Sequence, residues 1–286
     1  DLKTPEWEVF IDPASVERGR DFQLRVADPP KRYAKYFEKI VLVEKLREVR
    51  ALVGFSRIES PSDYDNPAAF PASQRARLSR TQPTWVPASE IRGEGLFFHF
   101  KEDLIQQWVA RVSGLDGVFL EAHKRWRIAR TLEPPQEFYP SVRFVLLHSF
   151  AHAIIRQFAV ECGYATAALR ERIYSRSPGE DEPKMAGVLI YTAAPDSEGT
   201  LGGLVSFGKP ETLERHLDQA LDSMRLCASD PLCAEHHPYR DGNTLHAASC
   251  HACLFAPETS CERGNKYLDR AVLVSTAERS DLAFFE

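Results

Sequence analysis

Apolar residues recur along the chain in two different patterns. Between residues 140 and 163 they return every three or four positions and form one broad face, which predicts a helix. This face consists of Val142, Val145, Leu146, Phe150, Ile154, Ile155 and Phe158. Gly163 follows them and marks the end of the helix. Short apolar runs between turn residues predict buried strands instead, at 95–100 and 187–192.

Weaker patterns predict the remaining elements. Further helices are expected at 102–113, 165–174, 211–226 and about 266–277. Between residues 33 and 53, apolar positions also recur at spacings of three and four over a charged face, which favours one or two helices. The run from Ile40 to Val43 is rich in β-branched residues, however, so a strand is the alternative there.

Prolines divide the chain. Five of them fall between residues 59 and 88 among Ser, Asp and Asn, which predicts a long surface loop, and Pro134 and Pro135 interrupt the chain again. The elements together predict an α+β fold of mixed helices and a small sheet. We expect a mixed N-terminal region at 1–135, which contains the proline-rich loop, and a second domain at 136–286.

The composition is that of an ordinary folded chain. Of its 286 residues, 43% are hydrophobic and 27% are charged, which excludes a disordered protein. The 36 Lys and Arg and 41 Asp and Glu leave a formal charge of −5, so no overall positive field attracts nucleic acid. Any DNA contact must therefore be a local patch.

Two basic stretches are candidates for such a patch. They are Arg75–Arg80 and Lys124–Arg130, and Trp85 and Trp126 could add stacking surfaces for bases. Solvated charge on loops and helices is the simpler explanation of either stretch taken alone.

The cellular location is expected to be the cytoplasm. No stretch approaches the roughly 20 apolar residues that a membrane span requires, and no secretory signal is visible. The sequence begins with Asp1 rather than Met, so we expect it to be part of a longer product.

Cysteines provide the most specific local feature. Five of the six lie in the last quarter of the chain, and Cys250 and Cys253 form a CxxC turn that directs two thiolates at one point. In a reducing compartment, this clustering predicts a zinc site that closes a C-terminal subdomain. A zinc ion held by four sulfurs leaves no position for water, so the site would be structural.

Which four cysteines bind zinc stays open at this point. Cys250 and Cys253 are the firmest candidates, and Cys227, Cys233 and Cys261 are the others. Four histidines are outside alternatives, namely His236, His237, His246 and His251. A set of free structural cysteines is the contrasting explanation, and Cys162, on an apolar helical segment, is expected to be a core residue.

His148 and His152 form a second constellation, because residues four apart share one face of a helix. The spacing is that of the zinc-protease motif HExxH, but Ser149 replaces the glutamate that would activate water. A metal-dependent hydrolase would therefore need another acidic residue, with three candidates, Glu161, Asp196 and Glu198. Two histidines hydrogen-bonded within a core are the simpler explanation.

The glycine-rich loop at 194–203 resembles a phosphate-binding loop only loosely. It lacks the GKS or GKT ending, and Asp196 and Glu198 would repel a phosphate. We interpret it as a tight connection, and because no Walker A motif is present we do not expect ATP hydrolysis.

Several segments in combination resemble a known family. They are 36–57, 94–97, 148–152, 189–203 and 248–254, and the most specific block is Glu258–Arg270. Together they are similar to the C-terminal region of DrmB-like proteins, a helicase-associated component of the DISARM antiphage system. The region from about 33 to 275 also looks like the zinc-binding MZB domain at the C-terminus of MrfA-type DNA helicases.

The resemblance implies a four-cysteine zinc site and work on DNA beside a helicase. It suggests an accessory, non-catalytic subunit of an antiphage DNA-targeting complex, with a helicase subunit and DNA as partners, no membrane contact and a hetero-oligomeric assembly. The domain at 136–286 would then be MZB-like. Two alternatives are the metal-dependent hydrolase at His148 and His152, and a stand-alone sensor of DNA modification.

Overall fold

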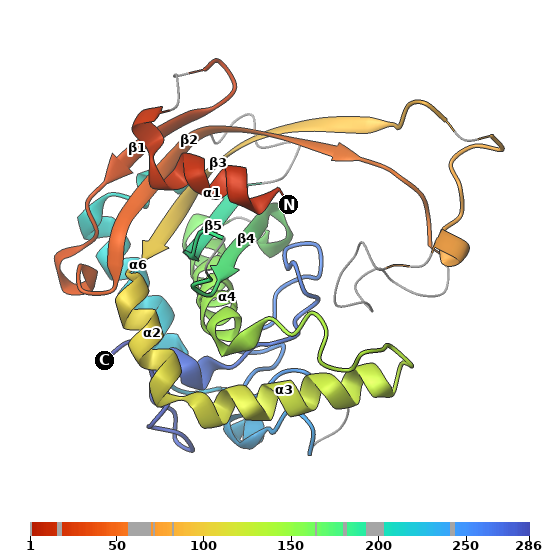
Figure 1. Ribbon diagram of the computed structural model, residues 1–286. Coiled ribbons are helices and arrows are strands. Elements are labelled where there is room, and N and C mark those ends of the chain that lie inside the picture. The colour runs from red at the N-terminus through yellow and green to blue at the C-terminus, as the bar shows by residue number, and fades with distance from the viewer. Residues whose placement is uncertain are drawn as a thin grey trace.

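The computed structural model describes residues 2–15, 19–56, 70, 72–81, 83–163, 165–179, 182–192, 203–240 and 244–286. Within these residues, five antiparallel strands form one sheet in the order β1-β2-β3-β5-β4 (Figure 1). The strands are β1 (Gln23–Ala27), β2 (Phe37–Ala51), β3 (Ala88–Phe100), β4 (Leu169–Arg176) and β5 (Met185–Thr192). The helices are α1 (Lys3–Ile11), α2 (Glu102–Arg111), α3 (Ser113–Ile128), α4 (Ser141–Cys162), α5 (Gly203–Ser206) and α6 (Pro210–Ser223).

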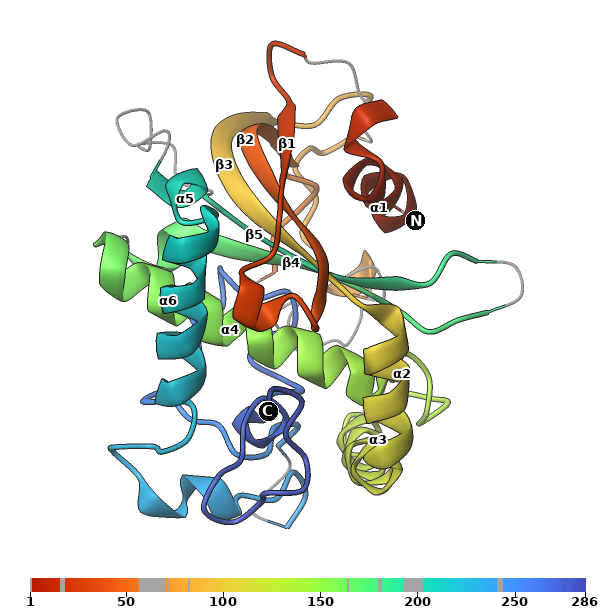
Figure 2. The same ribbon diagram turned by 90° about the vertical axis from the view of Figure 1, so that its left-hand side faces the viewer.

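Helices cover both faces of the sheet, with α1 on one side and α4 on the other (Figure 2). Alternate residues of β2 therefore enter different cores. Ile40 and Leu42 pack in the large core with α4, whereas Val41 and Val43 pack with Trp7 of α1. A strand covered on both faces has no polar side, so its apolar residues form a continuous run.

This double burial explains why the helix favoured at 33–53 was wrong. The segment is β2, and the β-branched alternative at 40–43 is confirmed. The strands at 95–100 and 187–192 and the helices at 102–113, 140–163 and 211–226 are confirmed, with shifted ends. The α+β fold class is confirmed as well.

Two other expected helices were wrong. Residues 169–176 form β4, in which Leu169, Glu171 and Ile173 turn to the buried face. A buried glutamate breaks the apolar alternation that would have indicated a strand. At 266–277 only a short 3₁₀ turn, Arg270–Val272, is present, because Tyr267 has a φ of 60° and its backbone N–H bonds to Leu245 instead.

The hairpin of β2 and β3 extends beyond the rest of the sheet (Figure 1). The two strands pair with each other as far as Ala51 and Ala88, whereas β1 pairs with β2 only up to Lys45. The hydrogen bond from Leu52 to Pro87 and the bridge between Phe55 and Ala76 continue the pairing. We call residues 49–56, 72–81 and 83–90 the hairpin arm. Of the expected proline-rich loop at 59–88, residues 59–69, 71 and 82 lie outside the described residues.

Strands on both sides of residue 135 share the single sheet, and the division into 1–135 and 136–286 stays a prediction. None of the described helices combines the length and apolar character that crossing a bilayer requires.

Candidate functional site

Four of the five predicted cysteines converge on one point. Cys227 lies just after α6, Cys233 sits in the 3₁₀ turn Pro231–Glu235, and Cys250 and Cys253 belong to the CxxC turn. Their Sγ atoms lie within 4.8 Å of one another. The Sγ–Sγ distances are 3.6 Å for Cys227–Cys250, for Cys233–Cys253 and for Cys250–Cys253.

These distances fit a tetrahedral zinc ion. A disulfide would require about 2.05 Å between sulfurs, and the four cysteines are free thiols. A zinc ion with four Zn–S bonds of about 2.3 Å holds its sulfurs about 3.8 Å apart. The observed 3.6 Å separations lie within a few tenths of an ångström of that spacing.

Short-range hydrogen bonds form the two turns that present the thiols. The Asp230 carboxylate accepts a hydrogen bond from Leu232 N–H and starts the turn that contains Cys233. In the CxxC turn, Cys253 Sγ accepts a hydrogen bond of 3.3 Å from Cys250 N–H. This backbone donor on the Cys253 sulfur favours its thiolate form.

Neighbouring groups also prepare Cys233 as a thiolate. The hydrogen bond from Cys253 lowers the pKa of Cys233 to about 5 in spite of burial, and the Arg270 guanidinium contributes to the lowering. The same contact, together with burial, raises the pKa of Cys253. Because a zinc ligand must be a thiolate, this lowering of the pKa favours the form of Cys233 that binds zinc.

The fifth cysteine, Cys261, joins a different group. It lies with His148 and His152 of α4 and Glu171 of β4, and their ligand atoms are within 4.8 Å of one another. His148 Nε2 is 3.1 Å from Cys261 Sγ and 3.0 Å from Glu171 Oε1. His152 Nε2 is 3.5 Å from Glu171 Oε2.

Charge sets the pKa values of this second group. Burial alone would lower the pKa of each histidine, but Glu171 and Cys261 outweigh it and raise the pKa of His148 to about 10 and that of His152 to about 9. Although burial favours the protonated acid, the two imidazoles hold the pKa of Glu171 well below its usual range. Burial and Glu171 oppose ionisation of Cys261, yet the histidines lower its pKa to about 7.

The outside candidates for zinc do not enter the four-cysteine group. His236 stacks on His246 and pairs with Thr244, while His237 faces Tyr239 and His251 faces Phe255. Of the acidic candidates for a hydrolase, Glu161 is described and does not belong to the histidine group. Glu161 pairs with Arg215, whereas Asp196 and Glu198 lie outside the described residues, as does the glycine-rich loop up to residue 202. Nothing is described for the Cys162 side chain.

Sequence reasoning missed Glu171, the acidic partner of the two histidines. It lies in the stretch that was expected to be a helix, so its alternation with Leu169 and Ile173 was not interpreted as the pattern of a strand. The signal that could have found it is a strand pattern with one charged residue on the buried face.

The two basic stretches have different surroundings. In 124–130, Trp126 and Arg127 are buried, and Arg125 pairs with Glu121, so the expected stacking role of Trp126 was wrong. Arg75, Arg77 and Arg80 are exposed on the hairpin arm and form no ion pair within the part of the chain that the structure describes. Trp85 on the same arm is 67% exposed.

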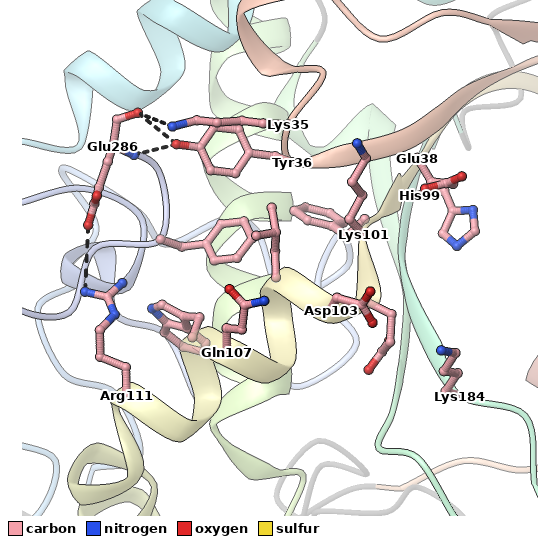
Figure 3. Close-up of a pocket in the computed structure, with 15 residues that line it drawn as sticks. Lys35, Tyr36, Glu38, His99, Lys101, Asp103, Gln107, Arg111, Lys184 and Glu286 are labelled. Atoms are coloured by element: carbon pink, nitrogen blue, oxygen red, sulfur yellow. Dashed lines mark hydrogen bonds and ion pairs between the residues drawn. The ribbon is translucent and has the colours of Figure 1, made fainter.

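A cleft of about 1090 Å³ opens beside α2 (Figure 3). Its wall includes Lys35 and Tyr36, which both bond to the backbone carbonyl of Glu286, and Arg111, which pairs with the Glu286 side chain. Acidic residues alternate with these basic ones in the wall. Burial lowers the pKa of His99 in the wall to about 4, so the imidazole of His99 is neutral at pH 7. The cleft has no concentrated positive charge for a phosphate chain.

Comparison with known proteins places this geometry in context. The family model described as the MrfA Zn-binding domain, MZB, matches residues 150–254, which include all four clustered cysteines. A curated protein of Bacillus paralicheniformis, "DISARM protein DrmB", is 35% identical over 289 residues, which cover 100% of this chain. The chain is DrmB-like and contains an MZB domain.

The DrmB-like chain spans about half the length of the curated relative it matches, 49%. Zinc is the cofactor that the MZB match and the cysteine cluster both support. His148 and Cys261 fall outside the matched 150–254, so the second group is only partly within that domain.

Proposed function

We propose that this chain is part of an accessory, non-catalytic subunit of a cytoplasmic antiphage complex, which works beside a DNA helicase and helps to hold DNA. The similarity along the whole chain to DISARM protein DrmB carries this proposal. The MZB match supports it, because that family is named after a zinc-binding domain of MrfA. A helicase subunit, DNA and a hetero-oligomeric assembly are the proposed partners and state.

In this proposal, Cys227, Cys233, Cys250 and Cys253 hold the zinc ion. The donors are four thiols at tetrahedral spacing, so zinc supplies structural cross-linking rather than chemistry. It would tie the segment after α6 to the CxxC turn. In the residues described after Ser223, the regular elements are two short 3₁₀ turns, and a structural zinc contributes its binding energy directly to folding in such regions.

The hairpin arm is the proposed DNA contact. It projects from the sheet, and it carries three exposed arginines, Arg75, Arg77 and Arg80. These arginines form no ion pair with an Asp or Glu among the residues that the structure describes. Exposed arginines can pair with phosphates, and an exposed tryptophan such as Trp85 can stack on an unpaired base. A local patch of this kind is what a chain with a net charge of −5 would need.

Salt-dependent DNA binding by the full-length protein with its helicase partner tests the proposal. The variant replaces Arg75, Arg77 and Arg80 by Ala. The control replaces Arg25, Arg215 and Arg279, which pair with Glu44, Glu161 and Asp281, so both variants lose the same charge.

If each arm arginine contacts one phosphate of duplex DNA, the negative slope of log K against log salt concentration should become shallower by up to about 2.7 in the arm variant. The slope of the control variant should stay close to that of wild type. Equal slopes in the two variants would remove the arm from DNA binding, and wild-type complex that fails to bind DNA would overturn the proposal as a whole.

A further inference from the structure

The group of His148, His152, Glu171 and Cys261 contains more electron-pair donors than its hydrogen bonds use. Both histidines are 0% exposed and Glu171 is 3% exposed. Within the described part of the chain, His152 Nε2 and Glu171 Oε2 have no hydrogen-bond partner although they face each other at 3.5 Å. Buried polar atoms without partners are rare in folded proteins and require an explanation.

The surroundings fix which atom of His152 faces the group. Its Nδ1 lies 2.9 Å from the carbonyl oxygen of Leu254, an arrangement in which Nδ1–H donates. Nε2 therefore points at a carboxylate oxygen of Glu171, and when a metal ion displaces the proton from this ring, Nε2 offers its lone pair beside that oxygen. A backbone carbonyl on the far nitrogen is the usual support of a metal-ligating histidine.

Glu171 is held in the same way. Its Oε1 accepts a hydrogen bond of 2.9 Å from Glu262 N–H. This bond fixes the carboxylate plane and leaves Oε2 directed at His152. Ligating carboxylates are typically held by such outer hydrogen bonds.

The turn around Cys261 prepares its sulfur as a ligand. Cys261 Sγ accepts hydrogen bonds from Arg263 N–H at 3.4 Å and from Asn265 N–H at 3.3 Å. Gly264 and Asn265 have φ values of 56° and 60°, and this left-handed turn brings both N–H groups to one side. Two backbone N–H groups aimed at one sulfur favour a negative charge there, here a thiolate.

We propose that His148, His152, Glu171 and Cys261 form a second metal site, which binds one zinc ion separately from the four-cysteine site. Zinc accepts imidazole, carboxylate and thiolate ligands together. Ligand atoms about 2.0 to 2.3 Å from a tetrahedral zinc lie about 3.3 to 3.6 Å apart. The measured separations of 3.0, 3.1 and 3.5 Å reach this range after movements of a few tenths of an ångström.

The site is structural rather than catalytic. The chain itself supplies four ligands, and the histidines and Glu171 are buried, so water has no coordination position. The ion joins α4, β4 and the block that contains Cys261. A structural zinc ion therefore replaces the metal-dependent hydrolase as the explanation of the histidine spacing. The proposed metal site does not depend on a role of the chain in antiphage defence.

Metal content per chain of the full-length protein, measured by inductively coupled plasma mass spectrometry, tests this site. Cys261→Ala and His148→Gln should each lose one zinc relative to wild type. Cys253→Ala should lose a different one, so that the double variant Cys253→Ala with Cys261→Ala loses two. His123→Gln is the matched control, because His123 is equally buried but both its ring nitrogens already have partners, Tyr267 Oη and Glu137 O.

A measurement on wild-type protein covers the case in which a variant fails to fold. Exchange of zinc for ¹¹³Cd should give two resonances, one typical of four sulfur ligands and one well upfield of it, because the second site has a single sulfur. A single resonance of the four-sulfur type would overturn the second site. Folded Cys261→Ala protein with the metal content of wild type would overturn it as well. In that case a proton shared between His152 Nε2 and Glu171 Oε2 would explain why these two atoms face each other.

Discussion

Glu102→Gln should destabilise the fold strongly, because Glu102 neutralises a buried arginine at the start of the helix that carries both histidines. Arg143 Nη1 donates to Glu102 Oε1 at 2.7 Å, and Arg143 Nη2 contacts Oε2. The side chains are 3% and 11% exposed. Arg143 also donates to the carbonyl of Met185 at 2.6 Å, so the pair links α2, α4 and β5.

The expected cost is about 3 kcal/mol, since removal of one partner of a buried ion pair typically costs 3 to 5 kcal/mol. Glu121→Gln is the control, because Glu121 forms an exposed pair with Arg125 one helical turn away. Such a pair contributes about 0.3 to 0.5 kcal/mol. Urea denaturation followed by circular dichroism gives both free energies of unfolding.

The pH dependence gives a second readout. The pKa of Glu102 is lowered in the folded protein: burial opposes the lowering, but the hydrogen bond and charge of Arg143 outweigh it. The stabilisation is therefore present above the unfolded-state pKa of about 4.3 and is lost as the pH falls through the folded pKa. The difference in free energy of unfolding between wild type and Glu102→Gln should therefore become smaller at acidic pH. Equal costs for Glu102→Gln and Glu121→Gln at pH 7 would refute the reasoning.

Two further predictions concern packing. Phe150→Ala should cost about 3 to 5 kcal/mol, because Phe150 is fully buried against Phe98 and Phe100, whereas Val160→Ala on the same helix, at a residue 81% exposed, should change unfolding by less than about 0.5 kcal/mol. Thermal unfolding of the two variants tests this difference, and similar midpoint temperatures would contradict the assignment of Phe150 to the buried face of α4. Gly187→Ala should cost about 1 to 3 kcal/mol, because its Cβ would lie 2.6 Å from Phe97 and 2.8 Å from Trp7. Gly117→Ala, where a Cβ meets nothing within 4 Å inside α3, should stabilise by about 0.5 to 1 kcal/mol, and the same sign for both glycines in urea titrations would count against this packing.

The sequence could predict elements whose hydrophobic pattern fits one kind of structure. Helix α4 shows an apolar face of helical period, and β5 is a short continuous apolar run between turns, as expected of a strand buried on both faces, so both were predicted correctly. Segment β2 also enters both cores, but it is longer, and its apolar residues at 37, 40, 43, 46 and 49 recur every three positions between charged ones, which imitates a helix.

The candidate site could be predicted in part. Local spacing indicated Cys250 and Cys253, but which further cysteines lie beside them depends on tertiary contacts between α6, the Pro231–Glu235 turn and the CxxC turn. The position of Cys261 beside His148 also depends on tertiary structure, since 113 residues separate them. Sequence spacing within one segment carries no information about such long-range neighbours.

Zinc content of the full-length protein after Cys253→Ala and after Cys253→His tests the central claim most directly. Histidine can replace a cysteine in structural zinc sites, which include Cys₄, Cys₃His and Cys₂His₂ sets. We expect Cys253→Ala to lose one zinc ion per chain together with thermal stability, and Cys253→His to retain the ion. Cys253→Ala protein with the zinc content of wild type would contradict the four-cysteine zinc site.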